Sequence, residues 1–152
     1  MGAKKVEVEI SKLTPKDLEK IIRIEKASFD SPWTRNAFLR DLEHNKRAFY
    51  LKASVDNNTA AFIGCWLILD VLHIVNLAVL PLYRRQGIAG RILNEAMNYG
   101  KSIGAHSATL EVRTENTAAI KLYKKFNFTV EGVRPDYYGP GCDALIMWKE
   151  LD

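Results

Sequence analysis

Apolar residues recur along the chain with two periods, and these periods predict its secondary structure. Alternating or continuous apolar runs predict strands, whereas apolar residues three and four positions apart predict helices. Strands are expected at residues 6–10, 48–54, 60–69, 73–80, 107–113, 128–134 and 142–150, and helices at 14–28, from 34 onward, at 86–103 and at 116–127. The order β-α-α-β-β-β-α-β-α-β-β predicts an α/β sandwich, in one domain over residues 1–152.

The predicted helix ends carry local signals. Thr14-Pro15 supplies an N-cap residue and a first-turn proline for the first helix. Pro32 then interrupts the helical pattern, because proline cannot continue the hydrogen-bond ladder. Thr34 and Asn116 are the expected N-caps of the second and fourth helices.

Residues 76–93 form the most informative stretch, an apolar strand followed by a glycine turn and a long helix. A helix that follows a tight turn leaves backbone N–H groups unpaired, and these groups bind anions together with the helix dipole. Gly87 lets a bulky group approach the backbone, and Arg84 and Arg85 add positive charge. The stretch predicts a phosphate or pyrophosphate site, although an ordinary turn with two solvated arginines explains it equally well.

Composition narrows the class of protein without choosing its chemistry. No apolar run is long enough to cross a membrane, and the start of the chain has no apolar signal core, so a cytoplasmic protein without a membrane partner is expected. Cys65 and Cys142 are expected to be free thiols, and no metal site is predicted. The net charge of +4 is spread along the chain, so it fits an acidic cofactor, an acidic partner or loose nucleic-acid contact.

Several spaced motifs resemble one known family. The run from Arg84 to Ala89 resembles the Arg/Gln-x-x-Gly-x-Gly/Ala signature of the GCN5-related N-acetyltransferase (GNAT) family. Further similar positions follow in the family's order, namely Leu110-Glu111-Val112-Arg113, Asn116, Ala118 to Tyr123 and Phe128. The likeness is greatest to the RimI and Ard types of N-terminal acetyltransferase, and it covers nearly the whole chain.

The resemblance implies a fold and a cofactor. The family's fold is a mixed, mostly antiparallel sheet of about seven strands flanked by four helices and splayed between strands four and five. Acetyl-CoA would be the cosubstrate, with its pantetheine paired to strand four and a backbone N–H of Val79 or a neighbour stabilising the oxyanion. The implied cofactor-binding residues are Leu77, Ala78, Val79, Arg84, Arg85, Gln86, Gly87, Ile88, Ala89, Gly90, Asn116 and Tyr123.

The resemblance also assigns catalytic roles. Glu111 matches the proposed general base of RimI-like enzymes, and the alternative is a solvated strand residue paired with Arg113. His73 matches a histidine of Ard-type enzymes that relays protons through water, although a lone histidine is more often a satisfied polar residue. Tyr123 matches the general acid that faces the thioester sulfur, and the alternative is a core aromatic.

Four aromatic residues are candidates for acceptor binding. Phe29 and Trp33 fall where the family forms one side of its acceptor groove, and Tyr137 and Tyr138 match a tyrosine pair that closes over the peptide N-terminus. Core, hinge or exposed-loop roles are the alternatives. Cys142 stands where RimI-like proteins usually have a glutamate, which bears on peptide preference more than on chemistry.

These assignments predict an acetyl-CoA-dependent transferase that acetylates the N-terminal α-amine of a protein, such as a ribosomal protein, by direct attack in a ternary complex. A lysine or small-amine acetyltransferase of the same fold is one alternative, and a non-catalytic regulator that binds acetyl-CoA or nucleic acid is another. Specific nucleic-acid binding is not expected, because Lys and Arg are not clustered with aromatic residues. A monomer or weak dimer is expected.

Overall fold

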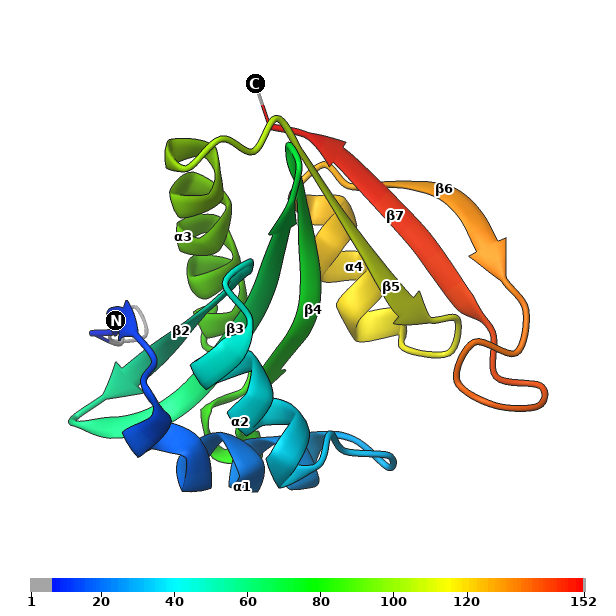
Figure 1. Cartoon of the computed structure of the whole chain (residues 1–152). Coiled ribbons are helices and arrows are strands. Elements are labelled where there is room, and N and C mark those ends of the chain that lie inside the picture. Colours follow the sequence, from blue (N-terminus) through cyan, green and yellow to red (C-terminus); the bar gives the residue numbers. More distant parts are fainter. Residues whose placement is uncertain (1–6, 152) are drawn as a thin grey trace, which may run out of the picture. The chain divides into compact units, whose positions relative to one another are not determined.

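The computed structural model describes residues 7–151. Within this range the strands are β1 (Glu9–Lys12), β2 (Ala48–Val55), β3 (Asn58–Ile68), β4 (Val71–Val79), β5 (Ser107–Arg113), β6 (Thr129–Arg134) and β7 (Ala144–Glu150). The α-helices are α1 (Leu18–Ser28), α2 (Arg35–His44), α3 (Ile88–Ser102) and α4 (Thr117–Lys125), and short 3-10 turns, η1 (Pro15–Asp17) and η2 (Pro81–Tyr83), precede α1 and follow β4. The predicted order of elements is confirmed (Figure 1).

The strands form one seven-stranded sheet in the order β1-β2-β3-β4-β5-β7-β6. β1 pairs with β2, β5 with β7, and β6 with β7 in antiparallel directions, whereas β4 and β5 are parallel. The parallel pairing joins Val71–Ile74 to Ser107–Leu110, although β4 continues to Val79 and β5 to Arg113. The mixed sheet is therefore confirmed, and its parallel pair is confined to the first four residues of each strand, as the predicted splay requires.

By its internal contacts the chain forms two compact units. The first unit contains residues up to Cys65 and Asn76–Ala96, and the second contains Trp66–Val75 and the residues from Met97 onward. β3, β4 and α3 contribute residues to both units. The single domain expected over residues 1–152 stays a prediction.

An aromatic core fills the first unit, where α1 and α2 lie next to each other (Figure 1). Phe38 meets Tyr50 and Phe62 edge-on, and Tyr50 stacks on Phe62 with the ring centroids 6.4 Å apart. The Tyr50 hydroxyl donates a 2.8 Å hydrogen bond to Asp41 Oδ2, so its polar end is satisfied inside the core. Gly64 faces this ring, and a Cβ there would lie 2.4 Å from Tyr50 Cε2.

The second unit contains three whole adjacent strands, β5, β7 and β6, with α4 beside them (Figure 1). Leu110, Phe128 and Met147 are buried in it. The register between β6 and β7 shifts between Val130 and Gly132, which marks a β-bulge in β6.

Several predicted element ends are confirmed and others move by a few residues. Thr34 and Asn116 both act as N-caps, because their side chains accept hydrogen bonds from the helices that follow. The first strand is Glu9–Lys12 rather than 6–10, and residue 6 lies outside the described range. β4 begins at Val71 rather than at residue 73, because Leu69 adopts a φ of 56° and turns the chain earlier.

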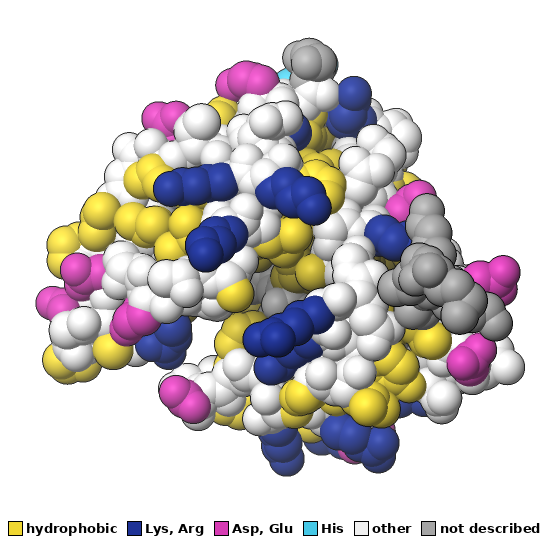
Figure 2. Space-filling model, turned by 180° about the vertical axis from the view of Figure 1, so that it is seen from behind, with side chains coloured by type: hydrophobic (Ala, Val, Ile, Leu, Met, Phe, Trp, Pro, Cys, Tyr) yellow, Lys and Arg dark blue, Asp and Glu magenta, His cyan; other side chains and the backbone are white. Residues whose placement is uncertain are grey.

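The described surface has no large single-sign region on the face seen in Figure 2. Lys and Arg side chains appear there as separate groups with hydrophobic and other side chains between them. None of the helices within residues 7–151 is both long enough and apolar enough to cross a membrane.

Candidate functional site

The second half of β4, in the first unit, presents backbone groups on one edge. Leu80 N–H donates to the carbonyl of Ala60 on β3 at 2.8 Å. Because N–H groups of successive strand residues point to opposite edges, the N–H groups of Leu77 and Val79 point away from β3. The pairing of β4 with β5 ends at Ile74. Leu77 and Val79 therefore have the backbone orientation that the predicted pantetheine pairing needs, while the Ala78 side chain is buried in the core.

The turn after β4 has the geometry of an anion-binding helix start. Arg85 and Gly87 have positive φ values of 63° and 78°, so α3 begins at Ile88 rather than at residue 86. The first helical hydrogen bond runs from Arg91 N–H to the carbonyl of Gly87 at 3.2 Å. The N–H groups of Ile88, Ala89 and Gly90 therefore precede the helical ladder, and Gly87 has no side chain to cap them. Gln86 is exposed and lies in the same turn.

Arg84 has a structural role in the same turn. Its Nε donates to the carbonyl of Val79 at 2.9 Å, and its Nη2 lies 3.3 Å from the Ser28 hydroxyl at the end of α1. Arg84 thus connects the turn to the end of β4 and to α1. Its predicted contact with the cofactor stays a prediction.

In the second unit, Glu111 lies on β5 among charged and aromatic side chains. Its carboxylate is 3.9 Å from Arg134 Nη2, and its side chain is 25% exposed. Arg113, the partner of Glu111 in the alternative interpretation, lies over the ring of Tyr138 at 4.5 Å. Arg134 is 55% exposed and Glu111 is partly exposed, so water can reach the carboxylate beside this weak ion pair.

Tyr137 and Tyr138 lie beside Glu111. Their rings meet edge-on with centroids 4.9 Å apart. Partial burial, Tyr137 and the nearby Glu111 charge raise the pKa of Tyr138 to about 12, although Arg113 opposes the shift. Burial and Glu111 also raise the pKa of Tyr137. The structure therefore brings the predicted base and both predicted acceptor tyrosines together.

His73 lies on the same face of the sheet as Glu111. It is in register with Thr109, two residues before Glu111 on the parallel neighbour β5. Residues in register share a face, and a step of two strand residues is about 7 Å. This spacing suits a relay through water rather than a direct hydrogen bond.

Tyr123 and Asn116, both of α4 and its cap, have structural roles. Tyr123 is only 8% exposed and packs edge-on against Phe128, with centroids 5.7 Å apart. Asn116 Oδ1 accepts a hydrogen bond from Ala119 N–H at 3.2 Å. The predicted general-acid and cofactor-binding roles of these two residues stay predictions.

Glu25, a residue that the sequence analysis missed, connects the predicted acceptor segment (residues 29–33) to β4. Its carboxylate accepts hydrogen bonds from Trp33 N–H at 2.8 Å and from Asn76 Nδ2 at 3.0 Å. Glu25 is 2% exposed, and burial raises its pKa although both donors act against the shift. Phe29 and Trp33 pack against the core of the first unit. One signal was available, because Glu25 follows Leu18 and Ile21 at helical spacing and so places an acid on an apolar face.

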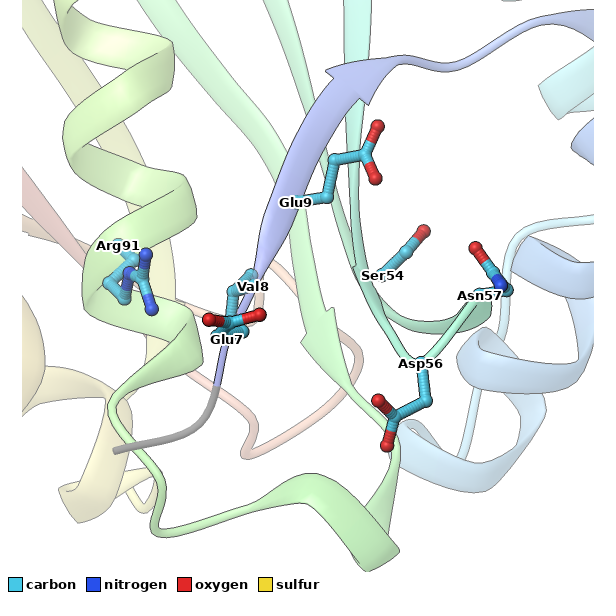
Figure 3. A pocket seen from close by; sticks show the side chains of 7 residues that line it. All are labelled: Glu7, Val8, Glu9, Ser54, Asp56, Asn57 and Arg91. Carbon is cyan, nitrogen blue, oxygen red and sulfur yellow. The ribbon is translucent and has the colours of Figure 1, made fainter. Parts of the chain in front are cut away.

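A cavity of about 600 Å³ also lies in the first unit (Figure 3), and none of the predicted site residues lines it, although its lining residue Arg91 directly follows Gly90. The residues that line it come from the start of the described chain and β1, the β2–β3 turn and α3, and they are Glu7, Val8, Glu9, Ser54, Asp56, Asn57 and Arg91. The lining contains three carboxylates and one guanidinium, a balance of charge that suits a cation better than an anionic cofactor.

The model of the Acetyltransferase (GNAT) family matches residues 18–128. The chain belongs to this family. A relative from Bacillus subtilis strain 168 is 37% identical over 149 residues, which are 97% of this chain and 99% of that protein. A relative from Haemophilus ducreyi, named [ribosomal protein bS18]-alanine N-acetyltransferase, is 34% identical over 144 residues, or 91% of this chain and 97% of that protein.

Solved structures of acetyltransferases have the same fold as this chain. The ribosomal-protein-S18-alanine N-acetyltransferase from Escherichia coli has a TM-score of 0.88 and 29% identity, covering 96% of this chain and 95% of that one. Ard1 from Thermoplasma volcanium has a TM-score of 0.86 and 27% identity, covering 94% of this chain and 97% of that one. The GNAT fold expected from the sequence is confirmed, and acetyl-CoA is the acetyl donor of the family.

Proposed function

We propose that this acetyltransferase transfers the acetyl group of acetyl-CoA to the N-terminal α-amine of a protein. The observation that supports this acceptor best is the cluster of Glu111, Tyr137 and Tyr138, which offers a carboxylate beside two aromatic rings. The relatives named as alanine N-acetyltransferases of ribosomal protein S18 support it independently.

An α-amine makes modest demands on a base. Its pKa is about 8, so about a tenth of it is neutral at pH 7, whereas a lysine with a pKa of about 10.4 is almost wholly charged. A solvent-accessible carboxylate acting through one water molecule is sufficient to take the proton that the attacking amine loses. Glu111 fills this role in the proposal, and His73 on the same face is the second candidate for the relay.

The remaining steps concern the acetyl group. Leu77 and Val79 bind the pantetheine through their β4 backbone groups, with Ala78 between them, and residues 84–90 with Asn116 bind the rest of the cofactor. One backbone N–H of β4 stabilises the oxyanion and thereby lowers the activation barrier by about 3–4 kcal/mol. Tyr123 donates a proton to the departing thiolate.

Attack is direct in the proposed mechanism, without an acyl-enzyme. A covalent route needs an activated thiol. Cys65 is fully buried in β3, and burial raises the pKa of its thiol far above the ordinary value. Cys142 lies in the β6–β7 loop, where its backbone pairs with Gly139 and Tyr138.

In this proposal Phe29 and Trp33 complete the acceptor site. The proposed acceptor is a ribosomal protein. An enzyme with such an acceptor would act in the cytoplasm. We further propose a monomer or weak dimer that does not bind a specific nucleic acid, in keeping with the separate basic groups of Figure 2.

The test is acetyl transfer from labelled acetyl-CoA to short peptides that vary in the first two residues. Peptides with blocked N-termini and an internal lysine serve as the matched acceptor control. We expect transfer to free N-termini only, and we expect Glu111→Gln and Tyr123→Phe to lower kcat by about 10²–10⁴-fold. Glu95→Gln, an exposed change on α3, is the control variant and should match the wild type.

Transfer to the blocked lysine peptides would contradict this proposal and favour the alternative in which the enzyme acetylates lysine side chains. No transfer to any peptide, with acetyl-CoA binding intact, would favour the regulator.

A further inference from the structure

The last turn of α1 is bonded to both ends of the β4 segment that is proposed to bind the cofactor. Glu25 accepts from Asn76, directly before Leu77, and the Ser28 hydroxyl lies 3.3 Å from Arg84, which in turn donates to the Val79 carbonyl. The other oxygen of Glu25 accepts from Trp33 N–H. A single carboxylate therefore connects the cofactor strand to the acceptor segment, and all of these groups belong to the first unit.

A carboxyl group at the buried position of Glu25 destabilises the fold unless hydrogen bonds compensate for its lost hydration. A buried charge loses its hydration, and only hydrogen bonds to the charged form compensate. Glu25 has two such bonds and is almost fully buried. Because these two hydrogen bonds are directional, with lengths of 2.8 and 3.0 Å, they fix the distance between Trp33 and Asn76 more firmly than apolar packing does.

We propose that Glu25 is a positioning residue that couples acetyl-CoA binding to acceptor binding. When the cofactor pairs with Leu77 and Val79, it orders the β4 backbone, and through Asn76 and Glu25 this order extends to Trp33. The acceptor segment is then held in the conformation that binds a peptide. The inference rests on the proposed function, because it takes residues 29–33 as part of the acceptor site.

The coupling is measurable as a ratio of affinities. An alanine-initiated hexapeptide is titrated by calorimetry into the free enzyme and into enzyme saturated with acetonyl-CoA, an unreactive analogue of acetyl-CoA. We expect the analogue to tighten peptide binding at least about fivefold, the lower end of typical allosteric coupling. Glu25→Ala should reduce this ratio to below twofold while acetonyl-CoA affinity stays within about threefold of the wild type.

Two further variants separate positioning from folding. In Glu25→Gln, the new amide oxygen can accept from Trp33 N–H and its nitrogen can donate to a turned Asn76 side chain, so the coupling should be restored. Asn76→Ala removes only the β4 side of the connection and should abolish the coupling. It therefore tests the inference if Glu25→Ala proves unable to fold. Glu95→Gln again serves as the surface control.

A second readout needs no acceptor. Hydrogen exchange of the segment around Trp33 should slow on addition of acetonyl-CoA in the wild type and in Glu25→Gln, but not in Glu25→Ala or Asn76→Ala. This readout holds even if no peptide of the panel is acetylated, so failure of the proposed function is recognisable separately. Unchanged coupling and protection in Asn76→Ala would overturn the inference, as would equal losses in Glu25→Ala and Glu25→Gln.

Discussion

Gly64 is the position where one added methyl group should disturb the fold most. In Gly64→Ala the new Cβ would meet Tyr50 at 2.4 Å from Cε2 and 2.6 Å from Cζ, and Tyr50 is 2% exposed. The ring cannot move outward without losing its stacking on Phe62 and its hydrogen bond to Asp41. Overpacking costs about 1–3 kcal/mol, and a broken buried hydrogen bond costs about 1–3 kcal/mol more.

The expected loss in the free energy of unfolding is therefore about 2–6 kcal/mol, less about 0.4–1 kcal/mol gained by replacing glycine. For a chain of this length, in which 1 kcal/mol shifts Tm by about 2–4 °C, that corresponds to a fall in Tm of at least about 3 °C by differential scanning calorimetry. Gly132→Ala is the matched control, since its Cβ would meet only Ile146 Cδ1 at an ordinary 3.8 Å. In a Tyr50→Leu background, Gly64→Ala should cost much less, because the ring is gone.

A Gly64→Ala protein that melts within about 2 °C of the wild type would refute this reasoning. It would mean that β2 and β3 can shift apart without loss, and that the aromatic core is looser than the stacking of Tyr50 on Phe62 indicates.

Three other changes have definite expectations. Thr34→Ala removes the side-chain acceptor of Ala37 N–H and should cost about 1 kcal/mol in chemical denaturation, whereas equal stability would deny the cap a role. Burial favours a higher pKa for Asp17, but the ion pair with Lys52 brings the pKa below its ordinary value. The ionised carboxylate therefore stabilises the fold at neutral pH. Asp17→Asn should therefore unfold more easily at pH 7, with the difference from wild type disappearing as the pH falls below about 4, and a constant difference would contradict the assignment. Gly87→Ala imposes a side chain on a φ of 78° and should raise the KM for acetyl-CoA as well as lower Tm. A fall in Tm with an unchanged KM would contradict the anion site.

Features set by short stretches of chain were predictable. Thr34 and Asn116 cap helices that begin one residue later, so the signal and the structure lie within a single turn. The turn between the strands expected at 48–54 and 60–69 is equally local, because Asp56 and Asn57 tolerate the positive φ values of 49° and 67° found there. The early start of β4 was not predictable, since Leu69 is a poor residue for a φ of 56° and only the surrounding strands impose it.

The connections within the site were harder to foresee. Glu25 and Asn76 are 51 residues apart, and no local pattern says that a glutamate on an apolar helix face will meet that asparagine. Arg84 was expected to face an anion, but the position of the Val79 carbonyl gives its guanidinium a bonding partner within the protein. The first case depends on how α1 lies against β4, and the second on how the turn after β4 folds back toward Val79. The one-dimensional pattern contains neither.

The two ends of the sheet bear on how this protein behaves in a concentrated solution. An outer strand exposes unpaired backbone groups, and a long, flat one invites another molecule to add a strand and begin aggregation. In the described chain, β1 is only four residues long, which limits the length over which a foreign strand could pair. At the other end, the bulge between Val130 and Gly132 twists β6 and interrupts its regular register. The sheet thus ends in two strands that are poor templates for edge-to-edge association, although Val130 and Val133 are exposed on β6.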